Sequence, residues 1–246
     1  MVMIVGHRGA RNLWPENGLG GFRRTAALGV ESVEFDVHAT ADGGVVVIHD
    51  PTMDRTTLGS GPVVRHTTAE VTATRLREDA RERVPTLDEV LAVYAGTGIE
   101  LQIEIKTDTV GDVYPGLERK VIDAVRGRGM ERHVRLTSFM PHILETVRRE
   151  WPEAPLVASV DRRSAEILGG MGAALDRFLA FGDICIAVEK AVLVHTLDLC
   201  LARTGRERLG AWVPNTPDEI AFWMGQPIRQ VTTDRPDLAL AARSGR

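Results

Sequence analysis

Three sets of polar residues in the first fifty positions close apolar runs that predict buried strands. The residues at these three points that are suited to chemistry are His7, Arg8, Glu34, Asp36 and His49. Strand ends are rigid, and both metal binding and acid–base catalysis need side chains that are held in a narrow range of geometry. Two histidines and two carboxylates in these positions predict a metal-assisted hydrolase.

A third carboxylate, Glu104, lies in a later strand-like run, 100–105. Glu34 and Asp36 are two residues apart on a predicted strand, so both side chains point to the same face. Buried carboxylates are unfavourable unless they are paired or bind a metal. We therefore expect Glu34, Asp36 and Glu104 to converge on one hard divalent cation, Mg²⁺ or Ca²⁺. The alternative is that Glu104 pairs with Lys106 or an arginine and that no metal binds.

The two histidines and their neighbours favour chemistry on a phosphate. His7 and His49 are suited to general acid–base catalysis because an unperturbed histidine titrates near neutral pH. Arg8 is able to bind a phosphate through two parallel hydrogen bonds, and Lys106 supplies a point charge. Trp212, at the end of a later strand, either packs on a substrate at the mouth of the fold or is an ordinary, partly buried core residue.

Two further polar residues are expected to be structural. His38 continues the face of Glu34 and Asp36, and we favour an exposed position in a turn over a role at the edge of the site. Asp234 follows the last strand-like run, and we expect it to cap a short helix that Pro236 begins.

Length, charge and cysteine content narrow the class of protein. The 246 residues fit one large domain, and the net charge of −4 gives no electrostatic basis for a nucleic-acid partner. No apolar run approaches the roughly 20 residues of a membrane span, and run 1–5 is too short for a secretory leader. Cys185 and Cys200 are expected to be reduced. We predict a cytoplasmic protein that acts on a small molecule without stable membrane insertion, and a homo-oligomer stays open.

Strand-like runs alternate with helical patterns, which is typical of a parallel sheet. The second and third of these runs are too close for a helix between them, so either one run is surplus or the alternation breaks there. An irregular insertion of about residues 51–84 follows the third run. There are nine such runs, one more than a (β/α)8 barrel holds: 3–6, 32–37, 45–48, 100–105, 134–137, 156–160, 184–188, 209–213 and 228–232.

Several short motifs follow one another in a specific order along nearly the whole chain. They are His7-Arg8-Gly9, Pro15-Glu16-Asn17, Glu34-Phe35-Asp36-Val37-His38, His49-Asp50-Pro51, Asp54-Arg55-Thr56-Thr57, Pro85-Thr86-Leu87, Glu104-Ile105-Lys106, Ser138-Phe139, Trp212 and Thr233-Asp234-Arg235-Pro236. In this order and spacing the chain resembles the glycerophosphodiester phosphodiesterase family. The resemblance implies an α/β fold of the TIM (β/α)8 barrel type, with residues 1–246 as a single domain.

The resemblance also implies an activity and a set of roles. The activity is hydrolysis of a glycerophosphodiester to glycerol 3-phosphate and an alcohol such as choline or ethanolamine, with the glycerol 2-hydroxyl as the first nucleophile. Carried over by position, the metal ligands are Glu34, Asp36 and Glu104, the acid–base pair is His7 and His49, the phosphate-binding residues are Arg8 and Lys106, and the supporting residues are Glu16 and Asn17.

Two other hypotheses keep the same site. A lipid phosphodiesterase similar to lysophospholipase D or sphingomyelinase D would need an apolar track near the barrel mouth. A non-catalytic barrel would bind phosphodiesters without cleaving them. The chain departs from the family's usual pattern after Trp212, where Val213-Pro214-Asn215 stands in place of Thr-Val-Asn, so the released alcohol stays open.

Overall fold

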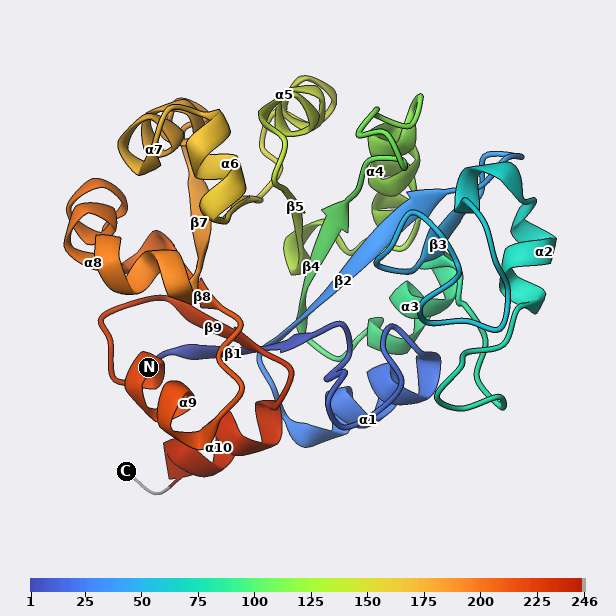
Figure 1. Ribbon diagram of the computed structural model, residues 1–246, viewed down its shortest axis with the longest axis horizontal. Coiled ribbons are helices and arrows are strands. Elements are labelled where there is room, and N and C mark those ends of the chain that lie inside the picture. The colour runs from blue at the N-terminus through green and yellow to red at the C-terminus, as the bar shows by residue number, and fades with distance from the viewer. Residues whose placement is uncertain (245–246) are drawn as a thin grey trace.

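A closed barrel of eight parallel strands forms the centre of the protein, as the computed structural model of residues 1–244 shows (Figure 1). Neighbouring strands follow the order β1-β9-β8-β7-β6-β5-β4-β2, and a further pairing of β1 with β2 closes the ring. The predicted TIM barrel is therefore confirmed. The barrel strands are β1 (Met3–His7), β2 (Ser32–Ala39), β4 (Glu100–Ile105), β5 (Val134–Ser138), β6 (Leu156–Val160), β7 (Ile184–Glu189), β8 (Leu209–Trp212) and β9 (Gln230–Thr233).

The surplus run of the sequence analysis is β3 (Val45–Val47), which lies outside the ring. It runs antiparallel to β2, with Val47 opposite Val37 and Val45 opposite Ala39. A tight turn joins the two strands, and Gly43 adopts a φ of 81° there, in the left-handed region that favours glycine. The hairpin returns the chain to the carboxyl end of β2, so residues after β3 are delivered to the same edge of the barrel.

Helices cover the outside of the barrel between successive strands (Figure 1). Four of them begin at reciprocal capping boxes, in which the side chains of Thr67, Thr86, Asp161 and Thr216 accept a backbone N–H. No helix among residues 1–244 has the length and apolar character needed to cross a membrane. The α-helices are α1 (Leu19–Leu28), α2 (Thr68–Ala73), α3 (Leu87–Tyr94), α4 (Leu117–Gly127), α5 (Pro141–Glu150), α6 (Arg162–Ile167), α7 (Met171–Leu179), α8 (Lys190–Thr204), α9 (Pro217–Met224) and α10 (Pro236–Ser244); short 3-10 turns are η1 (Val63–Arg65), η2 (Glu131–His133) and η3 (Arg206–Arg208).

The inside of the barrel is filled by polar side chains as well as apolar ones. Gln102 and Gln230 exchange amide hydrogen bonds of 2.9 and 3.0 Å across the barrel. Nearby, Glu100 accepts from Arg135 at 2.8 Å and from Arg229 at 3.0 Å. The buried amides of Gln102 and Gln230 thus satisfy each other, and the partly exposed ion pairs of Glu100 with Arg135 and Arg229 lie beside them.

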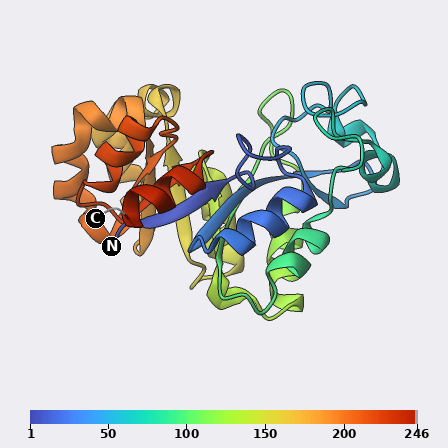
Figure 2. The ribbon, with the colours of Figure 1, turned by 90° about the horizontal axis from the view of Figure 1, so that it is seen from below.

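The insertion after β3 packs around a small apolar cluster of its own. Figure 2 shows its loops and α2 gathered at one end of the molecule. The position of this segment matters because it carries Asp50 and Arg55 to the edge of the barrel that holds the site. The cluster consists of Val46, Ile48, Met53, Val63, Val71, Leu76 and Val84.

Candidate functional site

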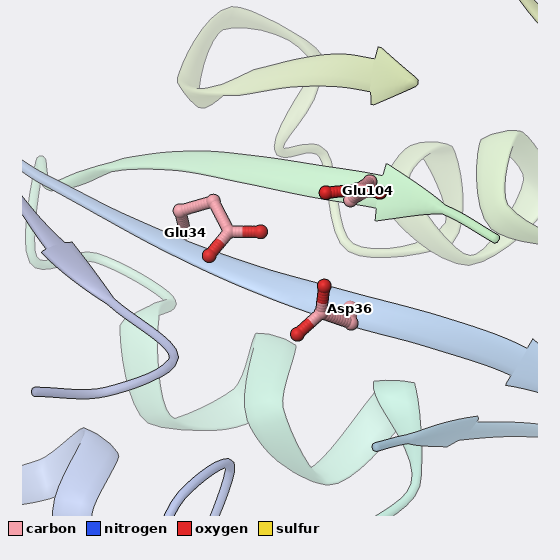
Figure 3. A group of neighbouring side chains, drawn as sticks. All are labelled: Glu34, Asp36 and Glu104. Carbon is pink, nitrogen blue, oxygen red and sulfur yellow. The ribbon is translucent and has the colours of Figure 1, made fainter. Parts of the chain in front are cut away.

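Strand register brings the predicted site residues together. His7, the last residue of β1, lies opposite Glu34 of β2, and Asp36 lies opposite Glu104 of β4. Since the three strands are neighbours, these four side chains meet at one edge of the barrel. Figure 3 shows the carboxylates of Glu34, Asp36 and Glu104 directed toward one another from β2 and β4.

The three buried carboxylates fit a divalent cation. Each offers one oxygen, and the three oxygens lie within 4.8 Å of one another. Among the described residues, no hydrogen-bond partner is found for either carboxylate oxygen of Glu34, although the side chain is buried. A buried carboxylate without hydrogen bonds is unfavourable unless a cation compensates it. An all-oxygen ligand set is the type that Mg²⁺ and Ca²⁺ prefer.

Glu104 pairs with Lys106 and also lies within the acidic group. Lys106 Nζ lies 2.5 Å from Glu104 Oε1 and 3.0 Å from Asp36 Oδ1, so the lysine pairs with the acidic group without separating its members. Burial raises the pKa of Glu34, and repulsion from Asp36 and Glu104 adds to the rise. Burial also opposes ionisation of Asp36, but the charges of Lys106 and Arg8 hold its pKa below the usual value.

His7 is held by a residue that the sequence analysis assigned to a different role. Its Nδ1 lies 2.5 Å from Oδ1 of Asp234, and Asp234 is fully buried. Asp234 also contacts Arg11 Nε at 2.9 Å and accepts from Asn215 Nδ2 at 2.7 Å. Its carboxylate is thus committed to the site, and the expectation that it caps the helix at Pro236 was wrong.

The position of Asp234 beside His7 follows from the closure of the barrel, which the helix-cap interpretation did not take into account. β9 pairs with β1, with Thr233 opposite Gly6, so the next residue on each strand stands side by side. Those residues are Asp234 and His7. Burial opposes ionisation of Asp234, but the hydrogen bond and the charge of His7 together with Arg11 lower its pKa to about 2. Burial lowers the pKa of His7, and the bond to Asp234 partly offsets this.

His49 is also held by an aspartate. Its Nδ1 lies 2.6 Å from Oδ1 of Asp50. Arg55 donates to Asp50 at 2.6 Å and to Glu16 at 2.8 Å, which ties the insertion to the β1–α1 loop. Burial lowers the pKa of His49, so its neutral form is favoured near neutral pH. In both histidines Nδ1 therefore faces an aspartate oxygen, so Nε2 is the ring nitrogen that remains for proton transfer.

The β1–α1 loop holds the remaining predicted residues in unusual backbone conformations. Arg8, Ala10 and Asn17 have φ values of 51°, 65° and 57°, which are uncommon for residues other than glycine. Asn17 Nδ2 donates to Asp36 Oδ2 at 3.2 Å, and Glu16 accepts from Arg8 at the same distance. Glu16 and Asn17 thus contact the residues that they were predicted to support.

A cavity of about 250 Å³ opens at this edge of the barrel. Six predicted site residues line it: His7, His49, Glu34, Glu104, Arg8 and Lys106. Phe139 and Trp212 line it as well, and their rings pack edge to face with centroids 5.6 Å apart. Trp212 donates to the carbonyl of Ala187 at 3.0 Å, which fixes the ring, so it borders the cavity and packs on the barrel at once.

His38 differs from its expected position. It is fully buried rather than exposed in a turn. Its two ring nitrogens lie 2.7 Å from the hydroxyl of Tyr114 and 3.0 Å from the carbonyl of His49. The turn begins only at Thr40, because β2 continues to Ala39, two residues past the predicted run.

Three kinds of group surround one cavity: the carboxylates that could bind a metal cation, the positively charged side chains of Arg8 and Lys106, and the two histidines. Arg8 and Lys106 remain protonated, since the surrounding carboxylates raise the pKa of each although burial opposes it. A bound divalent cation would add further positive charge on the acidic side. Such a site suits an anionic substrate whose reaction needs proton transfer, as at a phosphodiester.

The model of the glycerophosphoryl diester phosphodiesterase family matches residues 7–238. A glycerophosphodiester phosphodiesterase of Caldanaerobacter subterraneus is 38% identical over 156 residues, 61% of this chain and 63% of that protein. One of Bacillus subtilis is 30% identical over 181 residues, 66% and 60% of the two chains. The chain therefore spans about 60% of the length of these curated relatives.

Solved structures agree with this assignment. A crystal structure of a putative glycerophosphoryl diester phosphodiesterase from Agrobacterium tumefaciens has a TM-score of 0.86 and 31% identity, and the match covers 100% of this chain and 98% of that one. A phosphodiesterase of Oleispira antarctica, solved with the product sn-glycerol-3-phosphate, has the same fold at a TM-score of 0.80 and 24% identity, with 98% and 96% covered. This chain belongs to the glycerophosphoryl diester phosphodiesterase family.

Proposed function

We propose that this protein hydrolyses glycerophosphodiesters to glycerol 3-phosphate and an alcohol in a metal-dependent reaction. The observation that carries the proposal is the grouping of three buried carboxylates, two aspartate-bound histidines and two cationic side chains around one cavity. Family membership and the sn-glycerol-3-phosphate complex of the Oleispira antarctica phosphodiesterase support the choice of substrate.

We assign Glu34, Asp36 and Glu104 as ligands of one Mg²⁺ or Ca²⁺. When bound, the cation supplies positive charge that stabilises the phosphoryl oxygens and lowers the pKa of a nearby hydroxyl. Arg8 and Lys106, which line the same cavity, bind the phosphate oxygens. Trp212, which also lines the cavity, packs against the substrate.

His7 and His49 carry the protons. Burial lowers the pKa of each histidine and so favours the neutral form that accepts a proton, while the bonded aspartate favours the protonated form that donates one. One histidine, in its neutral form, removes the proton of the glycerol 2-hydroxyl as that oxygen attacks phosphorus, and the other, in its imidazolium form, protonates the alcohol oxygen as its bond to phosphorus breaks. Water then opens the cyclic phosphate. Asp234 and Asp50 stabilise each imidazolium while it holds the proton.

The test is turnover of glycerophosphocholine and glycerophosphoethanolamine by the wild type and by the His7→Ala and His49→Ala variants. Each substitution is expected to lower kcat at least about 10²-fold, because a positioned acid or base contributes that much. Full activity in either variant would refute the acid–base assignment. Tight binding of glycerophosphocholine without any product would favour a non-catalytic barrel instead.

A second candidate function, cleavage of single-chain lipid phosphodiesters, is favoured by one observation. A shallow groove of about 410 Å³ adjoins the cavity and shares Phe139 and Asp161 with it. Val110 and Ile167 line this groove, and they are 78% and 73% exposed. Exposed apolar side chains beside a polar site suit a hydrocarbon chain on the substrate.

Parallel assays of lysophosphatidylcholine and glycerophosphocholine separate the two candidates. If the groove binds a hydrocarbon chain, Ile167→Asp lowers kcat/KM for the lysolipid and leaves glycerophosphocholine unchanged. Val194→Asp is the matched control, since Val194 is an exposed apolar residue of α8 outside the groove. No turnover of the lysolipid by the wild type would leave glycerophosphodiesters as the substrates.

We further propose that residues 1–246 act as one domain in the cytoplasm. The barrel strands extend from Met3 to Thr233, and the first strand pairs with the last, which supports a single folding unit. Cys185 and Cys200 are both free thiols, which supports a reducing compartment. Cell fractionation with detection of the protein in the cytoplasmic fraction tests the location.

A further inference from the structure

His38 and Tyr114 form a buried polar pair that the catalytic proposal does not use. His38 is fully buried on β2, and Tyr114 is 3% exposed in the loop between β4 and α4. Their rings pack edge to face with centroids 5.6 Å apart. Burying two polar aromatic side chains at the edge of a site is favourable only where their hydrogen bonds are satisfied.

The partners of His38 fix the direction of its hydrogen bonds. The carbonyl oxygen of His49 only accepts, so His38 Nε2, 3.0 Å away, carries the proton and donates it. His38 Nδ1 is then the acceptor and receives the hydroxyl proton of Tyr114 at 2.7 Å. Two directed hydrogen bonds thus run from the β4–α4 loop through β2 to the backbone of His49.

The backbone of His49 needs such support because strand pairing ends just before it. Ile48 N still donates to Asp36 O at 3.1 Å, but β3 itself ends at Val47. The hydrogen bond from His38 Nε2 holds the carbonyl group of His49 itself. It therefore fixes the backbone from which the His49 side chain projects. Asp50 holds the other end of the same residue, at the imidazole Nδ1.

We propose that His38 and Tyr114 are positioning residues for His49. Through the Nε2–H bond to the His49 carbonyl, His38 keeps the imidazole of His49 at the cavity, and the Tyr114 hydroxyl keeps His38 in the orientation and protonation that this bond requires. The proposal rests on the proposed acid–base role of His49. It adds that a loop directly after Lys106 sets the placement of a histidine from another part of the chain.

The test compares kcat and KM for glycerophosphocholine in single and double variants. His38→Leu removes both hydrogen bonds and is expected to lower kcat about 10²-fold, since displacement of a catalytic group by about an ångström has that effect. His38→Gln keeps an N–H donor near the position of Nε2 and should retain most of the activity. Tyr114→Phe removes only the hydroxyl and should lower kcat by roughly 3- to 10-fold at little-changed KM.

A double-mutant cycle separates positioning of His49 from general support of the fold. In a His49→Ala background, Tyr114→Phe is expected to cause no further loss of kcat. Tyr94→Phe is the matched control, because Tyr94 is similarly buried, its hydroxyl donates to the carbonyl of Phe22 at 3.0 Å, and neither residue lines the cavity. It should lower thermal stability about as much as Tyr114→Phe and keep full activity.

Losses of kcat that add in the double variant, or equal activity of His38→Leu and His38→Gln, would overturn the positioning role while leaving the proposed reaction intact. Full activity of His49→Ala would refute the role of His49 and the positioning role together.

Discussion

Replacing Asp234 with asparagine should disable His7 without changing the shape of the site. Asp234 Oδ1 faces two donors, His7 Nδ1 and Arg11 Nε, and Oδ2 accepts from Asn215 Nδ2. Asparagine has a single oxygen, so either orientation of its amide sets an N–H against one of these donors. If the amide nitrogen faces His7, the imidazole proton moves to Nε2, the atom 3.7 Å from Glu34 Oε2. His7 would then be unable to accept a proton there.

The expected magnitudes follow from the interactions lost. Acid–base catalysis by one positioned group contributes about 10²- to 10⁴-fold, so we expect kcat to fall at least about 10²-fold in Asp234→Asn. A carboxyl pKa displaced from its usual 3.8 to about 2 corresponds to about 2 kcal/mol of favourable interaction with His7 and Arg11. The variant should lose about that much free energy of unfolding at pH 7.

Steady-state kinetics on glycerophosphocholine and urea unfolding measure the two effects. Asp237→Asn is the matched control, since Asp237 pairs with Arg235 in the first turn of α10 and its side chain is 33% exposed. It should leave kcat unchanged and alter stability by no more than about 0.5 kcal/mol. A folded Asp234→Asn variant with a kcat within about three-fold of wild type would refute the reasoning.

Three further outcomes are expected. Glu34→Gln should raise the Kd for Ca²⁺ at least about 10-fold in calorimetry, whereas Glu166→Gln on the exposed surface of α6 should not, and equal Kd values would remove Glu34 from the ligand set. Arg55→Gln should lower kcat about 10-fold, and Arg55→Lys should not restore it, because one ammonium group does not reproduce the fork that reaches both Asp50 and Glu16; full rescue by lysine would contradict this. In urea unfolding at decreasing pH, the wild type should lose stability from about pH 4 toward pH 2, because the pKa of Asp234 is lower in the folded than in the unfolded state. The Asp234→Asn variant should lose less stability over that pH range. Equal losses in the two proteins would contradict the lowered pKa of Asp234.

The strands and much of the candidate site were predictable from local pattern, whereas their closure into a barrel was implied by the resemblance to a known family. Apolar runs with polar ends predicted the strands, and the two-residue spacing of Glu34 and Asp36 predicted a shared face. The structure confirms that Glu34 and Asp36 lie with Glu104 in one group. The extra run was seen, but its antiparallel pairing with β2 depends on a tertiary contact that alternation alone does not specify.

Residues that were missed act through partners far along the chain. Asp234 and His7 are 227 residues apart and meet only because β9 pairs with β1. His38 lies beyond the predicted end of its strand, and its partner Tyr114 sits in an irregular loop. Helix-cap chemistry explained Asp234 locally, and that explanation was wrong because the closed barrel offered its carboxylate stronger partners.

Metal-dependent formation of glycerol 3-phosphate tests the central claim most directly. Phosphorus NMR of the protein with glycerophosphocholine should show glycerol 3-phosphate accumulating with Mg²⁺ or Ca²⁺, no product after EDTA, and renewed product when either cation is restored in excess. Undiminished turnover in EDTA, or no glycerol 3-phosphate with either cation, would contradict the account.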